Sequence, residues 1–480
     1  MPDPGPFGCR GLPPVNQTLR PQPCLESQQF CPESRQLCPE SPQQPPPRSA
    51  YLHIPFCHRR CFYCDFPVVP LGDRADGAAG PGAASIAAYL ELLRWEIGRS
   101  PAGPPLATVY FGGGTPSMLS PDQVGGLLDA LRRRFGLAPA AEISLEMDPA
   151  SFDRPRLAGY LAAGINRVSL GGQSFDDAVL ARLGRRHRSA ELRQAARWLG
   201  AAQRAGDLVS WSLDLIQGVP GAAPDKGTEM AAGAAPDPGA VLLQWRWELE
   251  QALALAPPHL SLYDLIVEPG TVFERQQQRG ALALPDGDTS ADLMDLSQRL
   301  LVSAGYGHYE VSNYALPGHA SRHNRVYWSG AGWWGFGLGA TAAPWGERQA
   351  RPRTRQAYAA WLAATGGDPA PPPPASGGMP FDELLLVGLR RREGVHLEGL
   401  AARAGLDPAA LAELRRQLQP FERAGLLRIE GPRWRLSDPQ GLALSNAVLR
   451  ELLLWWEQLG CRSSPAAPRP PDPAHRSAAD

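Results

Sequence analysis

Three cysteines lie within eight residues of one another, in the stretch CHRRCFYC at residues 57–64. Thiolates are soft ligands that suit zinc ions and iron–sulfur clusters. Closed zinc sites and ordinary iron–sulfur clusters use four protein ligands, so Cys57, Cys61 and Cys64 are one ligand short. The chemistry of this stretch therefore depends on what fills the fourth place.

Three kinds of site are compatible with the cysteine spacing. A zinc ion would need a fourth ligand, which His53 or His58 could supply. Cys61 and Cys64 could instead form a redox pair, although the usual context of such a pair is different. In a third arrangement the cysteines hold three irons of a four-iron cluster, and the fourth iron stays open for the amino and carboxylate groups of a small molecule. The cysteines alone do not choose among the three.

Six short segments rich in β-branched and aromatic residues are typical of β-strands. They lie at 51–55, 107–111, 142–147, 165–170, 208–216 and 259–265. Helical patterns lie between them, and one helix should begin at Ser120, with Pro121 in its first turn and Gln123 as a capping-box partner. This alternation predicts parallel strands with right-handed crossovers, in an α/β barrel or an open sheet. The units number about six, fewer than the eight of a complete barrel.

Polar or glycine-rich features follow five consecutive predicted strands. In parallel α/β folds the carboxyl ends of the strands meet at one edge, where ligands bind. After the cysteines come GGGTP at 112–116, Glu146, Gln173 and Asp214. Glycines allow close approach to a ligand, the acids could accept hydrogen bonds from ribose hydroxyls or an amino group, and Arg185 could pair with a carboxylate. A purely structural explanation is also open. The glycines could form a tight turn, and Glu146 and Asp214 could cap helices or pair with arginines.

The composition argues against several classes of protein. The 47 basic and 48 acidic residues give a net charge of −1, which provides no long-range attraction to nucleic acid or to an anionic membrane. We find no apolar run long enough to span a bilayer and no apolar core of a signal peptide. The eight cysteines are not spread as in a secreted disulfide-rich domain. We therefore predict a cytoplasmic protein with no membrane span and no nucleic-acid partner.

Shifts in composition divide the chain into five parts. We predict a disordered proline-rich tail at 1–49, a partial barrel at 50–345, a Pro/Gly-rich linker at 346–380, a small C-terminal domain at 381–458 and a second disordered tail at 459–480. Residues 221–240 are expected to form an inserted surface loop. In the C-terminal domain, helical patterns precede a hairpin that turns at Gly431 and Pro432, which is typical of a winged-helix-like α+β domain. Such a domain packs against its neighbours or binds DNA, and the charge balance gives DNA binding little support.

Two motifs in combination carry a family resemblance. C-x₃-C-x₂-C after the first strand and GGGTP after the second resemble the radical S-adenosylmethionine (SAM) superfamily. The segments YLHIPFC, YFGGGTPS, GINRVSLGGQSF, LGRRH, DLIQGVPG and SNYALPGHASRHNRVYW are similar to those of the HemW-type heme chaperones, relatives of oxygen-independent coproporphyrinogen III dehydrogenase. The resemblance covers residues 50–345 and 381–458. It implies an incomplete (β/α)₆ radical SAM barrel followed by the C-terminal domain.

The resemblance assigns roles to the residues that match the family's motifs. Cys57, Cys61 and Cys64 would hold a [4Fe-4S] cluster. The SAM pocket would be formed by Tyr51, Tyr63, Gly113, Gly114, Thr115, Glu146, Gln173, Arg185 and Asp214. Heme would lie against the HNRVYW stretch, with binding residues His323, Tyr327 and Trp328 and further apolar lining from Trp333, Trp334 and Phe336. Taken without the resemblance, these residues are explained by a buried aromatic cluster around a hydrogen-bonded histidine.

The two branches of the family differ at one position after the cysteines. The dehydrogenase has a further cysteine two positions after the third, whereas Phe66 stands there in this chain, as in the chaperones. Two motifs depart from the chaperone pattern. EMDP at 146–149 stands where EANP is usual, and GATAAP at 339–344 lacks a histidine expected near 342.

We therefore expect a heme chaperone, without classical turnover, that binds heme and a SAM-coordinated [4Fe-4S] cluster and transfers heme to an unidentified acceptor protein. A reductant protein and a homodimer stay open as further partners. One alternative is an oxygen-independent coproporphyrinogen III dehydrogenase, a radical SAM enzyme that oxidatively decarboxylates propionates in porphyrin biosynthesis. Another alternative is a zinc-dependent winged-helix DNA-binding protein.

Overall fold

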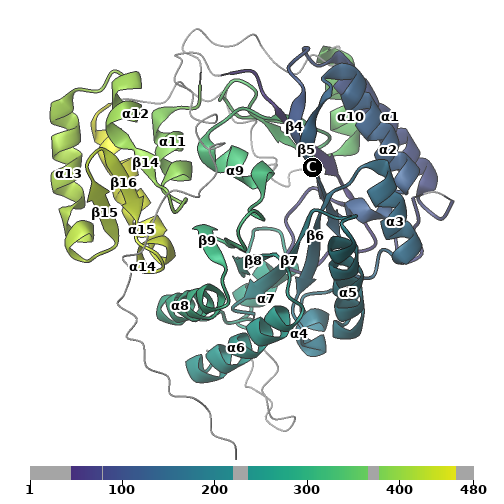
Figure 1. Cartoon of the computed structure of the whole chain (residues 1–480), viewed down its shortest axis with the longest axis horizontal. Helices are drawn as coiled ribbons and strands as arrows, with labels where there is room; N and C mark the ends of the chain where they lie inside the picture. Colours follow the sequence, from purple (N-terminus) through teal and green to yellow (C-terminus); the bar gives the residue numbers. More distant parts are fainter. Residues whose placement is uncertain (1–44, 78, 220–235, 366–377, 461–480) are drawn as a thin grey trace, which may run out of the picture. The chain divides into compact units, whose positions relative to one another are not determined.

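The structure, a computed structural model, describes residues 45–77, 79–219, 236–365 and 378–460 (Figure 1). Most of the two tails that were expected to be disordered, and most of the inserted loop expected at 221–240, lie outside these residues. The predicted domain boundaries stay predictions. The elements that position the predicted site residues all lie within the described ranges.

A nine-stranded sheet runs in the order β11-β1-β4-β5-β6-β7-β8-β10-β9. Its six central strands are parallel, and each pairs with the next. They are β1 (Ser49–Ile54), β4 (Leu106–Gly113), β5 (Leu137–Met147), β6 (Arg167–Gln173), β7 (Ser210–Gln217) and β8 (His259–Asp264). β11 (Trp334–Phe336) lies parallel to β1, while β10 (Asn313–Ala315) and β9 (Gly307–Glu310) form the other, antiparallel edge. The six predicted strands and the incomplete (β/α)₆ arrangement are confirmed.

Helices connect the parallel strands, and Figure 1 shows α1, α2, α3 and α5 along one side of them. The connecting helices are α1 (Ala83–Arg99), α2 (Pro121–Arg134), α3 (Arg154–Ala163), α4 (Asp177–Arg182), α5 (Ser189–Ala205) and α6 (Pro238–Ala254), while α7 (Val272–Gln278) and α8 (Gly287–Ser303) follow the last of these strands, β8. The predicted start of α2 is confirmed, because Ser120 and Gln123 exchange side-chain and backbone hydrogen bonds in a capping box with Pro121 in the first turn.

Side chains alternate along the parallel strands between an apolar and a polar face. Leu52, Val109, Leu145, Val168 and Leu213 belong to a buried core that includes residues of α1, α2 and α5. Successive side chains in a strand point to opposite faces, so the intervening positions lie on the other face of the sheet. These positions include Tyr51, Thr108, Tyr110, Glu142, Glu146, Ser169, Ser212, Asp214 and His259. The helices therefore cover the apolar face, and the polar face carries the candidate site.

The C-terminal domain has a hydrophobic core of its own, with Leu414 and Trp455 among its buried residues. Its elements are α11 (Phe381–Gly388), β14 (Val395–His396), α12 (Leu397–Arg403), α13 (Pro408–Arg423), β15 (Leu427–Glu430), β16 (Arg433–Leu436), α14 (Gln440–Ala443) and α15 (Ser445–Gln458). The strands form a sheet in the order β14-β16-β15. The predicted hairpin at Gly431 and Pro432 is confirmed by the antiparallel pairing of β15 with β16.

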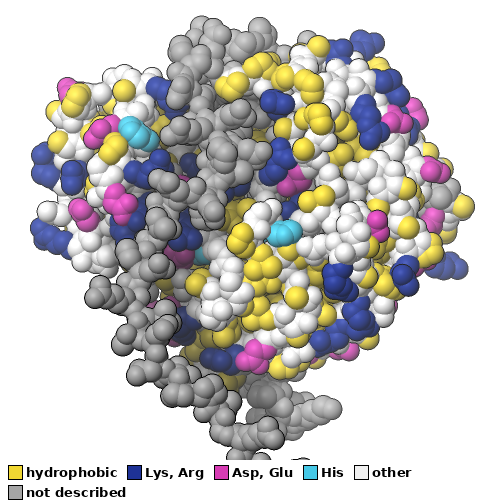
Figure 2. Space-filling model, viewed as in Figure 1, with side chains coloured by type: hydrophobic (Ala, Val, Ile, Leu, Met, Phe, Trp, Pro, Cys, Tyr) yellow, Lys and Arg dark blue, Asp and Glu magenta, His cyan; other side chains and the backbone are white. Residues whose placement is uncertain are grey.

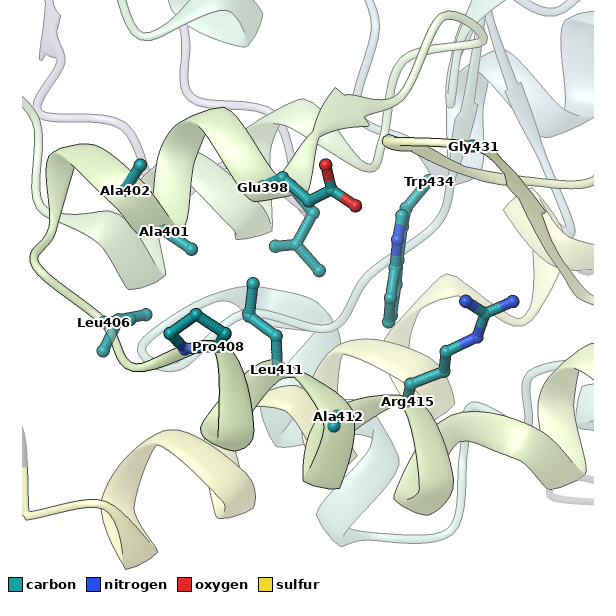
Figure 3. Close-up of a pocket in the computed structure, with 11 residues that line it drawn as sticks. Glu398, Ala401, Ala402, Leu406, Pro408, Leu411, Ala412, Arg415, Gly431 and Trp434 are labelled. Carbon is teal, nitrogen blue, oxygen red and sulfur yellow. The ribbon is translucent and has the colours of Figure 1, made fainter.

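A pocket of about 460 Å³ lies in this domain, between α12, α13 and the β15–β16 turn. Figure 3 shows the Trp434 ring opposite Leu411 and Pro408, with Glu398 and Arg415 beside it. The lining residues all come from this domain, so the pocket contains none of the predicted cofactor residues. Figure 2 shows Lys and Arg side chains spread over the face in view, with Asp and Glu among them.

Candidate cofactor site

The three cysteines lie in a loop that the rest of the barrel holds at several points. Cys57 ends the short strand β2 (Phe56–Cys57), which pairs with β3 (Val69–Pro70). The backbone of Phe62, between the other two cysteines, donates to Leu183 O at 3.0 Å and accepts from the Phe273 amide at 3.1 Å. The loop conformation is therefore set by residues far away in the sequence.

The thiols of Cys57, Cys61 and Cys64 are free of disulfides. Cys57 is buried, and this burial raises the pKa of its thiol to about 12 despite a hydrogen bond from Thr115 Oγ1 at 3.7 Å. Such a thiol stays protonated until a metal takes the place of the proton. The three free thiols are therefore available as ligands for a metal.

The zinc interpretation loses one of its two candidate histidine ligands, His53. His53 Nε2 donates to Pro67 O at 3.1 Å, and His53 Nδ1 accepts from Tyr51 Oη at 3.1 Å, so neither ring nitrogen is available. Among the described residues, no three His, Cys, Asp or Glu side chains converge on a point that one metal ion could occupy. In a four-iron cluster each thiolate binds a different iron, so the three cysteines fit a cluster better than a single ion.

The glycine run permits close approach, because β4 continues through Gly113 and the chain bends only at Gly114. A Cβ on Gly112 would lie 2.8 Å from the Tyr51 ring, and a Cβ on Gly114 would lie 2.8 Å from Cys57 Sγ. Gly113 has φ +116°, and a Cβ there would lie 2.6 Å from the His53 ring. Because these positions lack side chains, the end of β4 can pack directly against the cysteine loop.

Glu146 lies next to the glycine run, on the polar face of β5. Its carboxylate accepts from Tyr110 Oη at 2.9 Å and from the Gly113 amide at 3.1 Å. Burial raises the pKa of Glu146 to about 7, and these two hydrogen bonds offset part of the shift. The group can therefore change its proton occupancy near neutral pH, which suits an acceptor for a hydroxyl or an amino group.

Asp214 and Gln173 lie farther along the same edge of the sheet. Asp214 accepts from Ser169 Oγ at 2.5 Å and from Ser212 Oγ at 3.1 Å, and burial raises its pKa. Gln173 ends β6 with φ +66°, at an irregularity in the pairing of β6 with β7. This irregularity turns the end of the strand, where a side chain can be directed toward a ligand.

Arg185 joins the cysteine loop to the ends of β5 and β6. Its Nη1 lies 3.7 Å from Cys61 Sγ and 3.5 Å from Tyr63 Oη. Its Nη2 donates to Asp148 Oδ2 at 2.7 Å and to Gly171 O at 2.9 Å. The structure thus brings the predicted SAM residues to one edge of the sheet. The sequence analysis did not predict that Asp148 binds Arg185, although its position in the EMDP motif could have indicated a role.

The predicted heme residues lie on α9 (Arg322–Ser329), and His323 is fully buried there. His323 Nδ1 lies 2.8 Å from Thr108 Oγ1, and His323 Nε2 lies 2.8 Å from Tyr327 Oη. Burial lowers the pKa of His323 to about 3, so the ring is neutral. The arrangement is that of a hydrogen-bonded histidine in an aromatic cluster, and binding of heme iron would require the ring to release one partner.

Glu142, which the sequence analysis also missed, anchors the start of α9. Its carboxylate accepts from the amides of Arg322 and His323, each at 3.0 Å. An acidic side chain at a helix N-terminus satisfies amides that have no partner within the helix. The position of His323 therefore depends on a residue of β5, and no local pattern could have revealed this contact.

A row of aromatic rings connects the two regions. Tyr51 stacks on Tyr110 with ring centroids 6.2 Å apart, and Tyr110 stacks on His323 at 5.0 Å. Tyr327 meets the His323 ring edge-on at 5.1 Å and Trp333 at 4.9 Å. Trp328 packs, half-buried, in the same cluster as Trp333. Trp334 and Phe336 belong instead to the barrel core around Phe135.

The strand order, the cysteine loop and the residues at the strand ends define a radical SAM protein. The radical SAM superfamily model matches residues 51–225, and the HemN C-terminal domain model matches residues 381–444. The fold is similar to that of coproporphyrinogen III oxidase (HemN) from Escherichia coli, with a TM-score of 0.66 and 21% identity, covering 88% of this chain and 92% of that one. At this identity the similarity shows the fold alone.

The chain belongs to the HemW family. The heme chaperone HemW of Synechocystis sp. is 39% identical, over 86% of this chain and 98% of the relative. HemW of Mycobacterium tuberculosis is 36% identical, over 85% of this chain and 95% of the relative. The bovine protein named radical S-adenosyl methionine domain-containing protein 1, mitochondrial, is 33% identical, over 86% of this chain and 89% of the relative.

Proposed function

We propose that this protein is a heme chaperone that binds heme and a SAM-coordinated [4Fe-4S] cluster and passes heme to an acceptor protein. The names of its HemW relatives support the proposal. So does Phe66, which is exposed at the position where the dehydrogenase form has a cysteine. The observation that carries the cofactor part is the loop of three free thiols packed against the glycine run.

Cys57, Cys61 and Cys64 would hold three irons, and the open iron would take the amino and carboxylate groups of SAM. When bound, such a cluster supplies a one-electron reductant. The chain's own residues would orient the nucleotide. Thr115 and Arg185 lie beside the cysteines, while Glu146, Gln173 and Asp214 offer acceptors or donors farther along the edge.

Heme would bind against α9, with Tyr327 and Trp328 contributing apolar contact and His323 contributing an iron ligand. Because both nitrogens of His323 are hydrogen-bonded, ligation requires the ring to exchange Thr108 or Tyr327 for iron. This exchange would make heme binding weaker than binding by a free imidazole, which suits a protein that must also release heme.

Heme titration of the purified protein tests the proposal, with the Soret band as the readout. We expect the wild type to shift the band and His323→Ala to weaken the shift strongly. His319→Ala is the matched control, because His319 precedes α9 and is hydrogen-bonded to Ser210 rather than to the aromatic cluster. A wild type that leaves the Soret band unchanged would end the chaperone proposal.

The dehydrogenase alternative is not favoured, because the Synechocystis and Mycobacterium tuberculosis relatives are named heme chaperones and the likeness to HemN shows the fold alone. An anaerobic assay for protoporphyrinogen and 5′-deoxyadenosine separates the two functions. Formation of both products over many turnovers per protein molecule would support the dehydrogenase instead. The zinc-dependent DNA-binding alternative loses one of its two candidate histidine ligands, since both ring nitrogens of His53 are engaged elsewhere.

The partners and the compartment belong to the proposal as well. We propose an unidentified heme-acceptor protein as the partner, and a reductant protein and a homodimer stay open. In the described parts of the chain, no helix has both the length and the apolar character needed to cross a bilayer. The proposed cytoplasmic location rests on the cysteine distribution, and the bovine relative carries the word mitochondrial in its name.

A further inference from the structure

Asp148 is held rigidly at the end of β5, within the motif where this chain departs from the usual chaperone form. Its Oδ1 accepts from the Ala150 amide at 2.9 Å, and its own amide donates to Ser117 Oγ at 3.2 Å. Its Oδ2 lies 2.7 Å from Arg185 Nη2 and 3.7 Å from His187 Nδ1. The carboxylate is therefore fixed on one side by backbone and on the other side by two basic side chains.

The guanidinium of Arg185 is divided between this carboxylate and the cysteine loop. One edge, at Nη2, binds Asp148 and Gly171 O, and Nη1 points toward Tyr63 Oη and Cys61 Sγ. Both side chains are largely buried, with 11% of Arg185 and 19% of Asp148 exposed. A guanidinium that is held at one edge cannot rotate freely, so Nη1 stays beside the sulfur.

The charge of Asp148 is present throughout the neutral range. Burial alone would raise the pKa of Asp148, but Arg185 and His187 outweigh it and hold this pKa below its usual range. A negative charge in contact with the guanidinium weakens the positive field that reaches Cys61. Asparagine, the residue of the usual chaperone motif, would keep one hydrogen-bond acceptor and remove the charge.

We infer that Asp148 is a positioning residue, which orients Arg185 toward the cysteine loop and reduces the positive charge that Arg185 presents to the cluster and to the carboxylate of SAM. The claim about the cluster and SAM rests on the proposed function. The claim that Asp148 holds Arg185 beside Cys61 needs only the residues of this chain. This separation allows the two to be tested independently.

The first test uses the metal-free protein and measures the alkylation rate of each cysteine by mass spectrometry. Asp148→Ala should increase the rate at Cys61 severalfold, because a guanidinium that Asp148 no longer holds at Nη2 stops covering the sulfur, which lies 3.7 Å from Nη1. The effect should vanish when Arg185→Gln is also present. Asp122→Asn, on the exposed start of α2, is the control for loss of one charge. Equal Cys61 rates in wild type and Asp148→Ala would overturn the inference.

The second test uses protein reconstituted anaerobically with iron and sulfide. Asp148→Asn should move the cluster midpoint potential to more positive values, because added positive charge favours the reduced state. The variant should also bind SAM more tightly, whereas Asp148→Ala should bind SAM less tightly because Arg185 is no longer held. A potential and an affinity unchanged in both variants would contradict the inference. Failure of the wild type to form a cluster would instead refute the proposed function, while the alkylation rates still decide the role of Asp148.

Discussion

The cysteine loop and the region around α9 use similar residue types, yet their reactive atoms are satisfied differently. The sulfurs of Cys57 and Cys61 have long contacts of 3.7 Å from Thr115 Oγ1 and Arg185 Nη1. By contrast, both ring nitrogens of His323 lie 2.8 Å from hydroxyl partners. The loop can take a metal without breaking a strong internal hydrogen bond, whereas α9 must give one up to bind iron. The two regions therefore differ in the cost of binding a metal, although both carry side chains that can serve as metal ligands.

The largest effect is expected in the cysteine loop. Cys57→Ser should abolish cluster formation, because a hydroxyl is a poor ligand for iron where a thiolate is required. Iron and sulfide content and charge-transfer absorbance after anaerobic reconstitution measure the loss. Cys461→Ser, outside the motif, should reconstitute like the wild type. Retention of a full cluster by Cys57→Ser would show that the loop is not the site.

At α9 the comparison predicts a loss of stability in acid. The pKa of His323 is lowered to about 3, while an unfolded histidine titrates near 6.5. The unfolded chain therefore binds the extra proton first, and stability falls by about 1.4 kcal/mol for each pH unit below about 6.5. His323→Gln removes this titration. Thermal unfolding at a series of pH values should show the wild type losing its advantage over the variant as the pH falls, and parallel curves would contradict the prediction.

At the strand ends, Glu146 makes the stability change with pH in the opposite direction. Burial raises the pKa of Glu146 from 4.5 to about 7, so the folded state keeps a proton that the unfolded chain has lost. The stability that this bound proton contributes is complete below about pH 4.5 and is lost as the pH rises through about 7. The loss is at most on the order of 3 kcal/mol, and less where solvent reaches the carboxylate. Glu146→Gln should remove this pH dependence in thermal unfolding, while Glu250→Gln, at an exposed site, should leave it unchanged.

The smallest effect sharpens the difference between the regions. Thr108→Val removes one hydrogen-bond partner of His323 and should lower the free energy of unfolding by about 1 kcal/mol. The same change frees Nδ1, so heme affinity should rise if His323 is the iron ligand. Calorimetric unfolding and heme titration measure the two quantities. Thr354→Val, just before α10 (Arg355–Thr365), is the control. Unchanged or weaker heme binding by Thr108→Val would place the ligand elsewhere.

Several elements were predictable because their signals are local. The six strands follow from β-branched and aromatic segments, the start of α2 from Ser120 and Gln123, and the hairpin from Gly431 and Pro432. Parallel strands bring their carboxyl ends to one edge, so the gathering of the candidate site at that edge was predictable as well. The glycine run was ambiguous, because the same residues serve a turn or a close approach.

The contacts that give the site its character could not be predicted in this way. Asp148 meets Arg185 across two strands, Glu142 holds an amide of α9 that lies 181 residues away, and Thr108 meets His323 across 215 residues. Whether a histidine is free or engaged depends on which hydroxyl the fold brings to it. No pattern near position 323 contains that information.

The sequence by itself determined the ligand types, their order along the chain and the alternation of strands and helices, because each depends on neighbouring residues. Only the tertiary structure decided which of these groups are already satisfied. Hydrogen bonds and charge pairs between distant segments form when the sheet closes. Burial then sets the proton occupancy of Glu146 and His323, whereas Arg185 and His187 keep Asp148 ionised against the effect of burial.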